Sequence, residues 1–251
     1  MTRVTIAQLY PAELGVTGDR GNVRAIERRL AARGAESTTV LVAPGEDLPA
    51  DLDVLVIGNG PLSALRSVRS DLSARAGALE AFVADGGALF SVGGSAELLG
   101  AGIDVADGEA VPGLGILPYR VARVRDRRVG YIIVDTPEGA VVGFEDHASE
   151  WTLASADAAY GTVSEGHGSY QRGELRGEFV RRGNAFAGNV QGPVLPLNPA
   201  LTDVLVEAVA ARRGFALSAA VPGDLEEYAE AARTKILMRP TRDKGFKTIQ
   251  V

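Results

Sequence analysis

The stretch ALFSVGGSAELLG, residues 88–100, has the layout of a nucleophile elbow. A short apolar strand leads into a glycine turn at Gly93 and Gly94, and a helical pattern follows. In acyl-transfer enzymes this layout lifts a nucleophilic side chain clear of the sheet, beside backbone N–H groups that stabilise an oxyanion. Here the residue before the glycine pair is Val92, which cannot attack a carbonyl, and the chain has no cysteine. The pattern therefore predicts a scaffold for acyl transfer that lacks its nucleophile.

Other residues that could supply chemistry near this turn are few. Ser91 and Ser95 flank the turn, but a serine needs a base within hydrogen-bond reach before it can attack. The two histidines, His147 and His167, are too few for a histidine-based metal site. We therefore expect no metal and no cofactor.

Two loops and one strand end carry the remaining candidates. Asp19 lies in the turn TGDRGN ahead of a helical pattern, where an aspartate is usually a helix cap and more rarely a catalytic orienter. Gln191 ends a strand in GNVQGP; its amide could bind a ligand or stabilise the loop, but it cannot shuttle protons. The loop GNGPLSAL, residues 58–65, follows a strand as phosphate loops do, yet lacks their Lys-Ser/Thr pair.

The first hundred residues alternate between strand and helix patterns. Parallel strands buried on both faces read as continuous apolar runs, and DVLVIGNG fits that description. Such alternation indicates a parallel, doubly wound sheet. The predicted strands span residues 4–10, 37–43, 53–60 and 88–92, and the predicted helices span 22–34 and 63–87, the second broken near Ala76 and Gly77.

The middle of the chain reads as short antiparallel strands separated by turns. Residues 177–190 predict a hairpin about Arg182, Gly183 and Asn184. Pro199 suits the first position of a helix over 198–214, and a last amphipathic helix covers 222–237, followed by a basic tail. The predicted short strands are 113–124, 127–136, 140–149 and 160–170.

Composition excludes several classes of protein. The 251 residues carry a formal net charge of −6, which argues against a nucleic-acid binder because such proteins usually present a basic face. No apolar run approaches the ~20 residues of a membrane span. The N-terminus lacks the apolar core and cleavage site of a signal peptide. The sequence therefore predicts a cytoplasmic protein.

Several stretches, taken in order, resemble class I glutamine amidotransferase domains of the cobyric acid synthase-like (CobB/CobQ) branch. Within it the chain resembles the amidotransferase subunits of lipid II isoglutaminyl synthases. The resemblance implies a flavodoxin-like, three-layer α/β fold with a mostly parallel central sheet and antiparallel extensions. It assigns residues 1–215 to the amidotransferase-like domain and 216–251 to a C-terminal helix and basic tail. The matching stretches are LYPAELGVTGDRGNVRAI, DVLVIGNG, GGALFSVGG with ELLG, VPGLGILP, VGFEDH and QGPVLPLNPALTDVL.

The resemblance also implies where catalytic groups should stand. Family members hydrolyse glutamine with an elbow cysteine, a histidine and an acidic partner. The acidic position is kept as Asp19. The cysteine falls on Val92, or on Gly93 when the match is anchored on the following LLG, and the histidine falls on Gln191. A glutamine that follows the elbow is replaced near Ala96.

The glutamine pocket of the family is kept only in part. An arginine that holds glutamine falls at Arg127, with Arg128 beside it. The pocket loop is changed in sequence. The positions implied to contact a ligand are Gly58, Asn59, Gly60, Gly93, Gly94, Arg127 and Gln191.

Loss of nucleophile and base together predicts a changed function, because these groups act as a unit. In the family, ammonia passes to a Mur-ligase-like, ATP-dependent subunit that amidates a carboxylate of the peptidoglycan precursor. We expect a catalytically silent subunit that forms a heterodimer with such a partner. One alternative is an active subunit that uses a changed mechanism, such as a serine nucleophile, or a free amine. Another is a sensor that holds an amino acid or amide in the old pocket.

Overall fold

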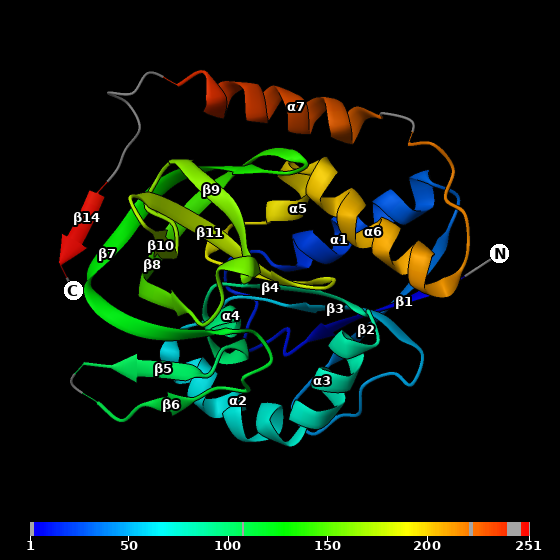
Figure 1. Cartoon of the computed structure of the whole chain (residues 1–251). Helices are drawn as coiled ribbons and strands as arrows, with labels where there is room; N and C mark the ends of the chain where they lie inside the picture. The colour runs from blue at the N-terminus through cyan, green and yellow to red at the C-terminus, as the bar shows by residue number, and fades with distance from the viewer. Residues whose placement is uncertain (1–2, 107, 221–222, 240–246, 251) are drawn as a thin grey trace.

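The computed structural model describes residues 3–106, 108–220, 223–239 and 247–250. Its first part alternates strands and helices, as the sequence predicts (Figure 1). The helical segment over 63–87 is two helices separated at Arg75, next to the predicted break. The elements are β1 (Arg3–Leu9), α1 (Arg20–Ala32), β2 (Glu36–Val42), β3 (Leu52–Ile57), α2 (Leu62–Ala74), α3 (Ala76–Ala84), β4 (Ala88–Val92) and α4 (Gly94–Leu99).

The central strands are parallel and covered on both faces. β1 pairs in parallel with β2 and β3, and β3 pairs in parallel with β4. Along β3, Val54 and Val56 join the core under α1, whereas Leu55 and Ile57 join the core over α2 and α3. This alternation follows from the two-residue period of a strand. The result is the predicted three-layer α/β fold, with helices on the two faces of the sheet (Figure 1).

The second part extends the sheet, mostly with antiparallel strands. Strands predicted over 113–124 and 127–136 are one long strand, β7, which pairs with β8. A turn was expected between these two predicted strands, but the run RVRDRR continues the strand with a register shift between Arg123 and Arg128. The elements are β5 (Gly102–Val105), β6 (Val111–Pro112), β7 (Tyr119–Thr136), β8 (Gly139–Leu153), the 3₁₀ turn η1 (Ala156–Ala158), β9 (Ala159–Glu165), β10 (Tyr170–Arg172), β11 (Leu175–Arg182), β12 (Ala185–Gly188), β13 (Val190–Gln191), α5 (Val194–Leu197), α6 (Pro199–Arg213), α7 (Asp224–Leu237) and β14 (Lys247–Gln250).

The sheet order brings the two halves together. Among the described residues it runs β2-β1-β3-β4-β12-β11-β10-β8-β7-β5-β6. The predicted hairpin is confirmed as β11 and β12, with Gly183 at φ 57° in the turn. Because β12 pairs in parallel with β4, the end of β4 lies beside the β12–β13 segment that delivers Gln191.

The C-terminal helix α7 is joined to α1 by a partly buried ion pair, and α1 is joined to α6 by another. Arg29 of α1 donates through Nε to Asp203 of α6 at 2.7 Å and pairs with Glu226 of α7 at 3.1 Å. The Arg29 side chain is only 11% exposed, so these pairs are screened less than surface pairs.

Replacing Arg29 by alanine should lower the free energy of unfolding by about 1–3 kcal/mol, because it removes the cation that the partly buried Asp203 and Glu226 share, although Asp203 keeps its pair with Arg33. Hydrogen exchange should increase first in α7. Arg24→Ala is the matched control, since its pair with Glu27 is exposed and worth about 0.5 kcal/mol or less. Equal losses for the two variants would contradict this role for Arg29.

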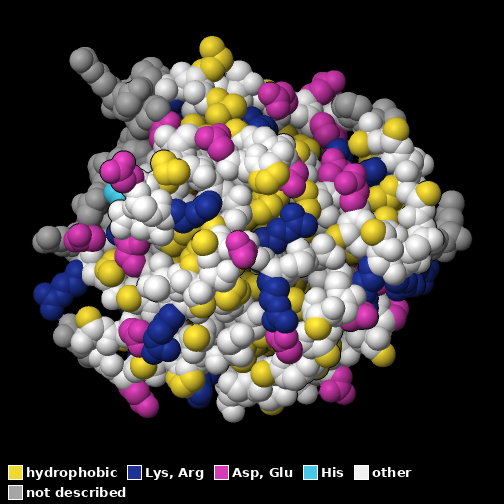
Figure 2. Space-filling model, viewed as in Figure 1, with side chains coloured by type: hydrophobic (Ala, Val, Ile, Leu, Met, Phe, Trp, Pro, Cys, Tyr) yellow, Lys and Arg dark blue, Asp and Glu magenta, His cyan; other side chains and the backbone are white. Residues whose placement is uncertain are grey.

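The visible surface carries both signs of charge. Figure 2 shows basic and acidic side chains interspersed over one face, rather than a single basic field. None of the described helices combines the length and apolar character needed to cross a bilayer.

Candidate functional site

The turn after β4 is made by Gly93, not by Val92. Gly93 has φ 64° and ψ −132°, a backbone conformation that L residues rarely adopt. Val92 ends the strand and its side chain is buried in the core beneath α1. Gly93 therefore adopts the unusual backbone conformation expected at an elbow, and the β-branched Val92 remains in the strand.

Asn59 fills the space above this turn. Its Oδ1 accepts a hydrogen bond from the Gly94 backbone N–H at 2.7 Å, and its Nδ2 donates to Gln191 Oε1 at 3.1 Å. A Cβ added to Gly93 would lie 2.3 Å from Asn59 Oδ1. In an elbow enzyme, the N–H after the nucleophile faces the oxyanion. Here that N–H is bonded to the Asn59 side chain.

Asp19 holds Asn59 in place. It is buried at the N-cap position of α1, as expected, but its side chain makes none of the capping hydrogen bonds that such a position usually has. Its Oδ2 instead accepts from the Asn59 N–H and the Thr17 hydroxyl, both at 3.0 Å. Burial raises the pKa of the Asp19 carboxyl. A Cβ on Gly58 would lie 2.5 Å from Asp19 Cγ, so the close approach requires glycine there.

Gln191 is fixed on both sides of its amide. Its Oε1 accepts from Asn59, and its Nε2 donates to the Asp146 carbonyl oxygen at 3.0 Å. It lies on β13, which pairs with β8 beside Asp146. The Gln191 amide therefore joins the loop after β3 to β8.

A cavity of about 480 Å³ opens beside these residues. It gathers Asn59, Gly60, Gly94, Arg127 and Gln191 from the sequence-predicted set. The other predicted positions, Gly58, Asp19, Val92 and Gly93, do not line it. Its full lining is Val16, Thr17, Asn59, Gly60, Pro61, Leu62, Gly94, Glu97, Arg123, Arg127, Asp146, His147, Ala148, Asn189 and Gln191.

The two neighbouring arginines of β7 have different surroundings. Arg127 lines the cavity and donates to Asp146 at 2.6 Å, an interaction that raises the pKa of the arginine. Arg128 is not part of the lining; it pairs with Glu150 and donates to the Ser149 carbonyl oxygen. Of the two, only Arg127 lines the cavity.

Among the polar residues of the cavity lining, sequence reasoning missed Glu97, Arg123 and Asn189, and it considered His147 only as a metal ligand. Glu97 is buried and accepts from Arg123 Nε at 2.8 Å. Glu97 follows Gly93 by one helical turn. This spacing becomes informative only when the structure shows that Gly93 makes the elbow.

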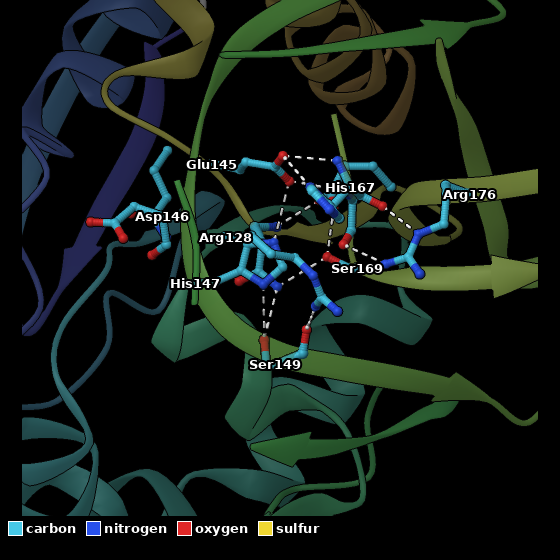
Figure 3. Close-up of polar contacts among 12 residues, drawn as sticks. Arg128, Glu145, Asp146, His147, Ser149, His167, Ser169 and Arg176 are labelled. Atoms are coloured by element: carbon cyan, nitrogen blue, oxygen red, sulfur yellow. Dashed lines mark hydrogen bonds and ion pairs between the residues drawn. The ribbon is translucent and has the colours of Figure 1, made fainter. Parts of the chain in front are cut away.

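His147 belongs to a row of polar residues on β8. Glu145, His147 and Ser149 alternate along the strand and so share one face, which is the signal that could have found them (Figure 3). His147 Nε2 lies 3.4 Å from Glu145, and its Nδ1 lies 3.5 Å from the Ser149 hydroxyl. Glu145 is fully buried and accepts the N–H groups of His167 and Gly168. The row therefore joins His147 of the cavity lining to the fully buried Glu145 and Ser149.

Glu178 binds the polar residues next to this row. It is fully buried, and it accepts from the Ser169 hydroxyl at 2.5 Å and the Asn189 N–H at 2.6 Å. Burial raises the pKa of the Glu178 carboxyl despite these hydrogen bonds.

A raised folded-state pKa means that Glu178 stabilises the fold most when it is protonated. Its contribution should be complete below the ordinary pKa of 4.5 and be lost as pH rises through the folded value. Denaturant unfolding at several pH values should therefore show a decrease in stability over that range which Glu178→Gln removes. An unchanged pH slope in the variant would contradict this.

The two elbow serines face the interior. Ser91 and Ser95 are buried, and their hydroxyls bond to each other at 2.8 Å. Ser95 also reaches the carbonyl oxygens of Ile57 and Val92. Neither serine lines the cavity.

The fold and the elbow define a glutamine amidotransferase scaffold. The chain belongs to the CobB/CobQ-like glutamine amidotransferase domain family, whose model matches residues 6–198.

Two relatives show which members of this family the chain is similar to. The chain is 27% identical over 247 residues to the lipid II isoglutaminyl synthase (glutamine-hydrolyzing) subunit GatD of Staphylococcus aureus, covering 97% of this chain and 99% of that protein. It is 26% identical over 208 residues to the corresponding Streptococcus pneumoniae subunit, covering 81% and 79%. A solved structure of a glutamine amidotransferase aligns with TM-score 0.51 and 19% identity, covering 81% of this chain and 98% of that one; it bears on the fold alone.

Proposed function

We propose that this chain is a catalytically silent amidotransferase-like subunit that supports a Mur-ligase-like, ATP-dependent partner. The acceptor would be a carboxylate of a peptidoglycan precursor. Its similarity along nearly the whole length to subunits of lipid II isoglutaminyl synthase supports the pathway and the assembly. The class of partner follows from the family resemblance.

The observation that carries the proposal is the position of Asn59. Its carbonyl oxygen lies where the first side-chain atom of a nucleophile at residue 93 would stand, 2.3 Å from that atom. It also engages the Gly94 N–H that would otherwise stabilise an oxyanion. In this proposal the bonded unit of Asn59, Gly94 and Gln191 stands where the family resemblance implies the nucleophile, the oxyanion donor and the base.

The burial of Ser91 and Ser95 argues against the alternative in which a serine is the nucleophile. Ser91 and Ser95 hydrogen-bond one another, and neither has an imidazole among its hydrogen-bond partners in the described part of the chain. A serine without a positioned base is a weak nucleophile. Free ammonia is then the nitrogen source that the proposal favours for the complex.

Purification from the native cell tests this proposal. We expect an ATP-dependent ligase to co-purify, and the complex to amidate its carboxylate substrate with ammonium but not with glutamine. The ligase alone, supplied with ammonium, is the control and should be less stable or less active. Equal turnover with glutamine at the same nitrogen concentration would overturn the proposal.

A further inference from the structure

An apolar groove lies between α1, α5 and α7. It encloses about 700 Å³, and Pro193, Leu195, Pro196 and Leu197 line it from the α5 side. Tyr228 of α7 stands at its wall with 72% of its surface exposed. An exposed aromatic ring beside a proline-rich floor is the kind of feature that anchors a protein interface.

Three arginines follow one another along the exposed side of α1. Arg20, Arg24 and Arg28 are spaced by four residues and so share one helix face, and Arg24 and Arg28 line the groove. Arg24 pairs with Glu27 at 2.9 Å. Within the described ranges, Arg20 and Arg28 have no ion-pair partner. This basic edge stands out in a chain whose formal net charge is −6.

The groove continues toward the blocked elbow. Gly21 and Pro193 line the groove, while Thr17 and Gln191 line the cavity of the site. A Cβ on Gly18 would lie 3.3 Å from Pro193, so these two segments are packed against each other. The groove therefore adjoins the two segments, around Gly18 and Pro193, that lead into the cavity.

The geometry points to this groove as the docking surface for an acidic segment of the partner subunit. The segment presents an apolar side chain to the Tyr228 and proline surface, and carboxylates to Arg20 and Arg28. Charge complementarity selects this occupant: a neutral apolar segment would leave two arginines beside the contact without counter-charges. This inference rests on the proposed function, because it assumes that a partner exists.

Photo-crosslinking inside the native cell tests the surface. The probe is p-benzoylphenylalanine in place of Tyr228 in the full-length chain, with the same probe at Leu175 as the control. Leu175 is 59% exposed and is the first residue of β11, outside the groove. Mass spectrometry of the crosslinked peptide identifies both the partner and the segment.

We expect the Tyr228 probe to crosslink an ATP-dependent ligase at a stretch rich in Asp and Glu. The pair Arg20→Glu and Arg28→Glu should reduce the yield by about tenfold or more, whereas the matched charge reversal Arg172→Glu should not. Thermal melting confirms that the variants are folded.

Three outcomes would overturn the inference. They are a ligase crosslinked through Leu175 but not Tyr228, a crosslinked segment without acidic residues, or a yield unaffected by the arginine reversals. If no ligase is crosslinked by either probe and none co-purifies, the proposed function fails as well. The surface and the partner hypothesis are thus tested separately.

Discussion

Replacing Gly93 by alanine should lower the free energy of unfolding by about 2–4 kcal/mol. The backbone at this position has positive φ, which costs an L residue about 1–3 kcal/mol. The new Cβ would also push Asn59 away from Gly94, at about 1 kcal/mol for the lost hydrogen bond. Denaturant unfolding of the purified variant measures the loss.

A second glycine serves as a control that separates the cost of backbone strain from the cost of steric contact with Asn59. Gly183 also has positive φ, but a Cβ there would meet nothing within 4 Å, so Gly183→Ala reports backbone strain alone. The crowding part of the Gly93 effect should decrease when Asn59 is shortened to alanine. A double-mutant cycle with additive effects, rather than a coupling of about 1 kcal/mol, would contradict the blocked elbow.

Glu178→Ala should cost about 3–5 kcal/mol of folding stability. The change leaves two buried donors, the Ser169 hydroxyl and the Asn189 N–H, without their acceptor, and it opens a cavity behind the site. Glu174→Ala, an exposed change on the neighbouring turn, should remain within about 0.5 kcal/mol of the wild type. A loss below 1 kcal/mol for Glu178→Ala would mean that the buried network is not structural.

Much of the first half of the fold could be predicted from the sequence. The continuous apolar runs that became β3 and β4 are buried throughout, as expected for central parallel strands. Val23, Ile26 and Leu30 form the buried stripe of α1 that their spacing predicts. These features are local, so a single stretch of sequence specifies them.

The site depended on contacts that no single stretch contains. The elbow register stayed open between Val92 and Gly93 because the adjacent glycines Gly93 and Gly94 and the LLG that follows anchor the match in two different registers. The Asn59 contact needs the loop after β3, the turn after β4 and Gln191 to meet, with Asp19 fixing the loop. The type of a polar residue does not reveal which distant segment its side chain will contact.

The merging of β7 into one strand was missed for a related reason. Its central run is highly charged, and charge at that density is typical of a turn. The structure satisfies several of these charges with carboxylates on β8 and α4, for example Arg127 with Asp146 and Arg123 with Glu97. Such pairing is visible only once the neighbouring elements are in place.

Glutamate release from glutamine is the most direct measurement of the central claim. The purified chain, alone and in complex with its co-purified partner and ATP, should release no more glutamate than a protein-free control. Release that rises in proportion to protein concentration and is lost in Gln191→Ala would show that this scaffold still breaks an amide, and would contradict the account.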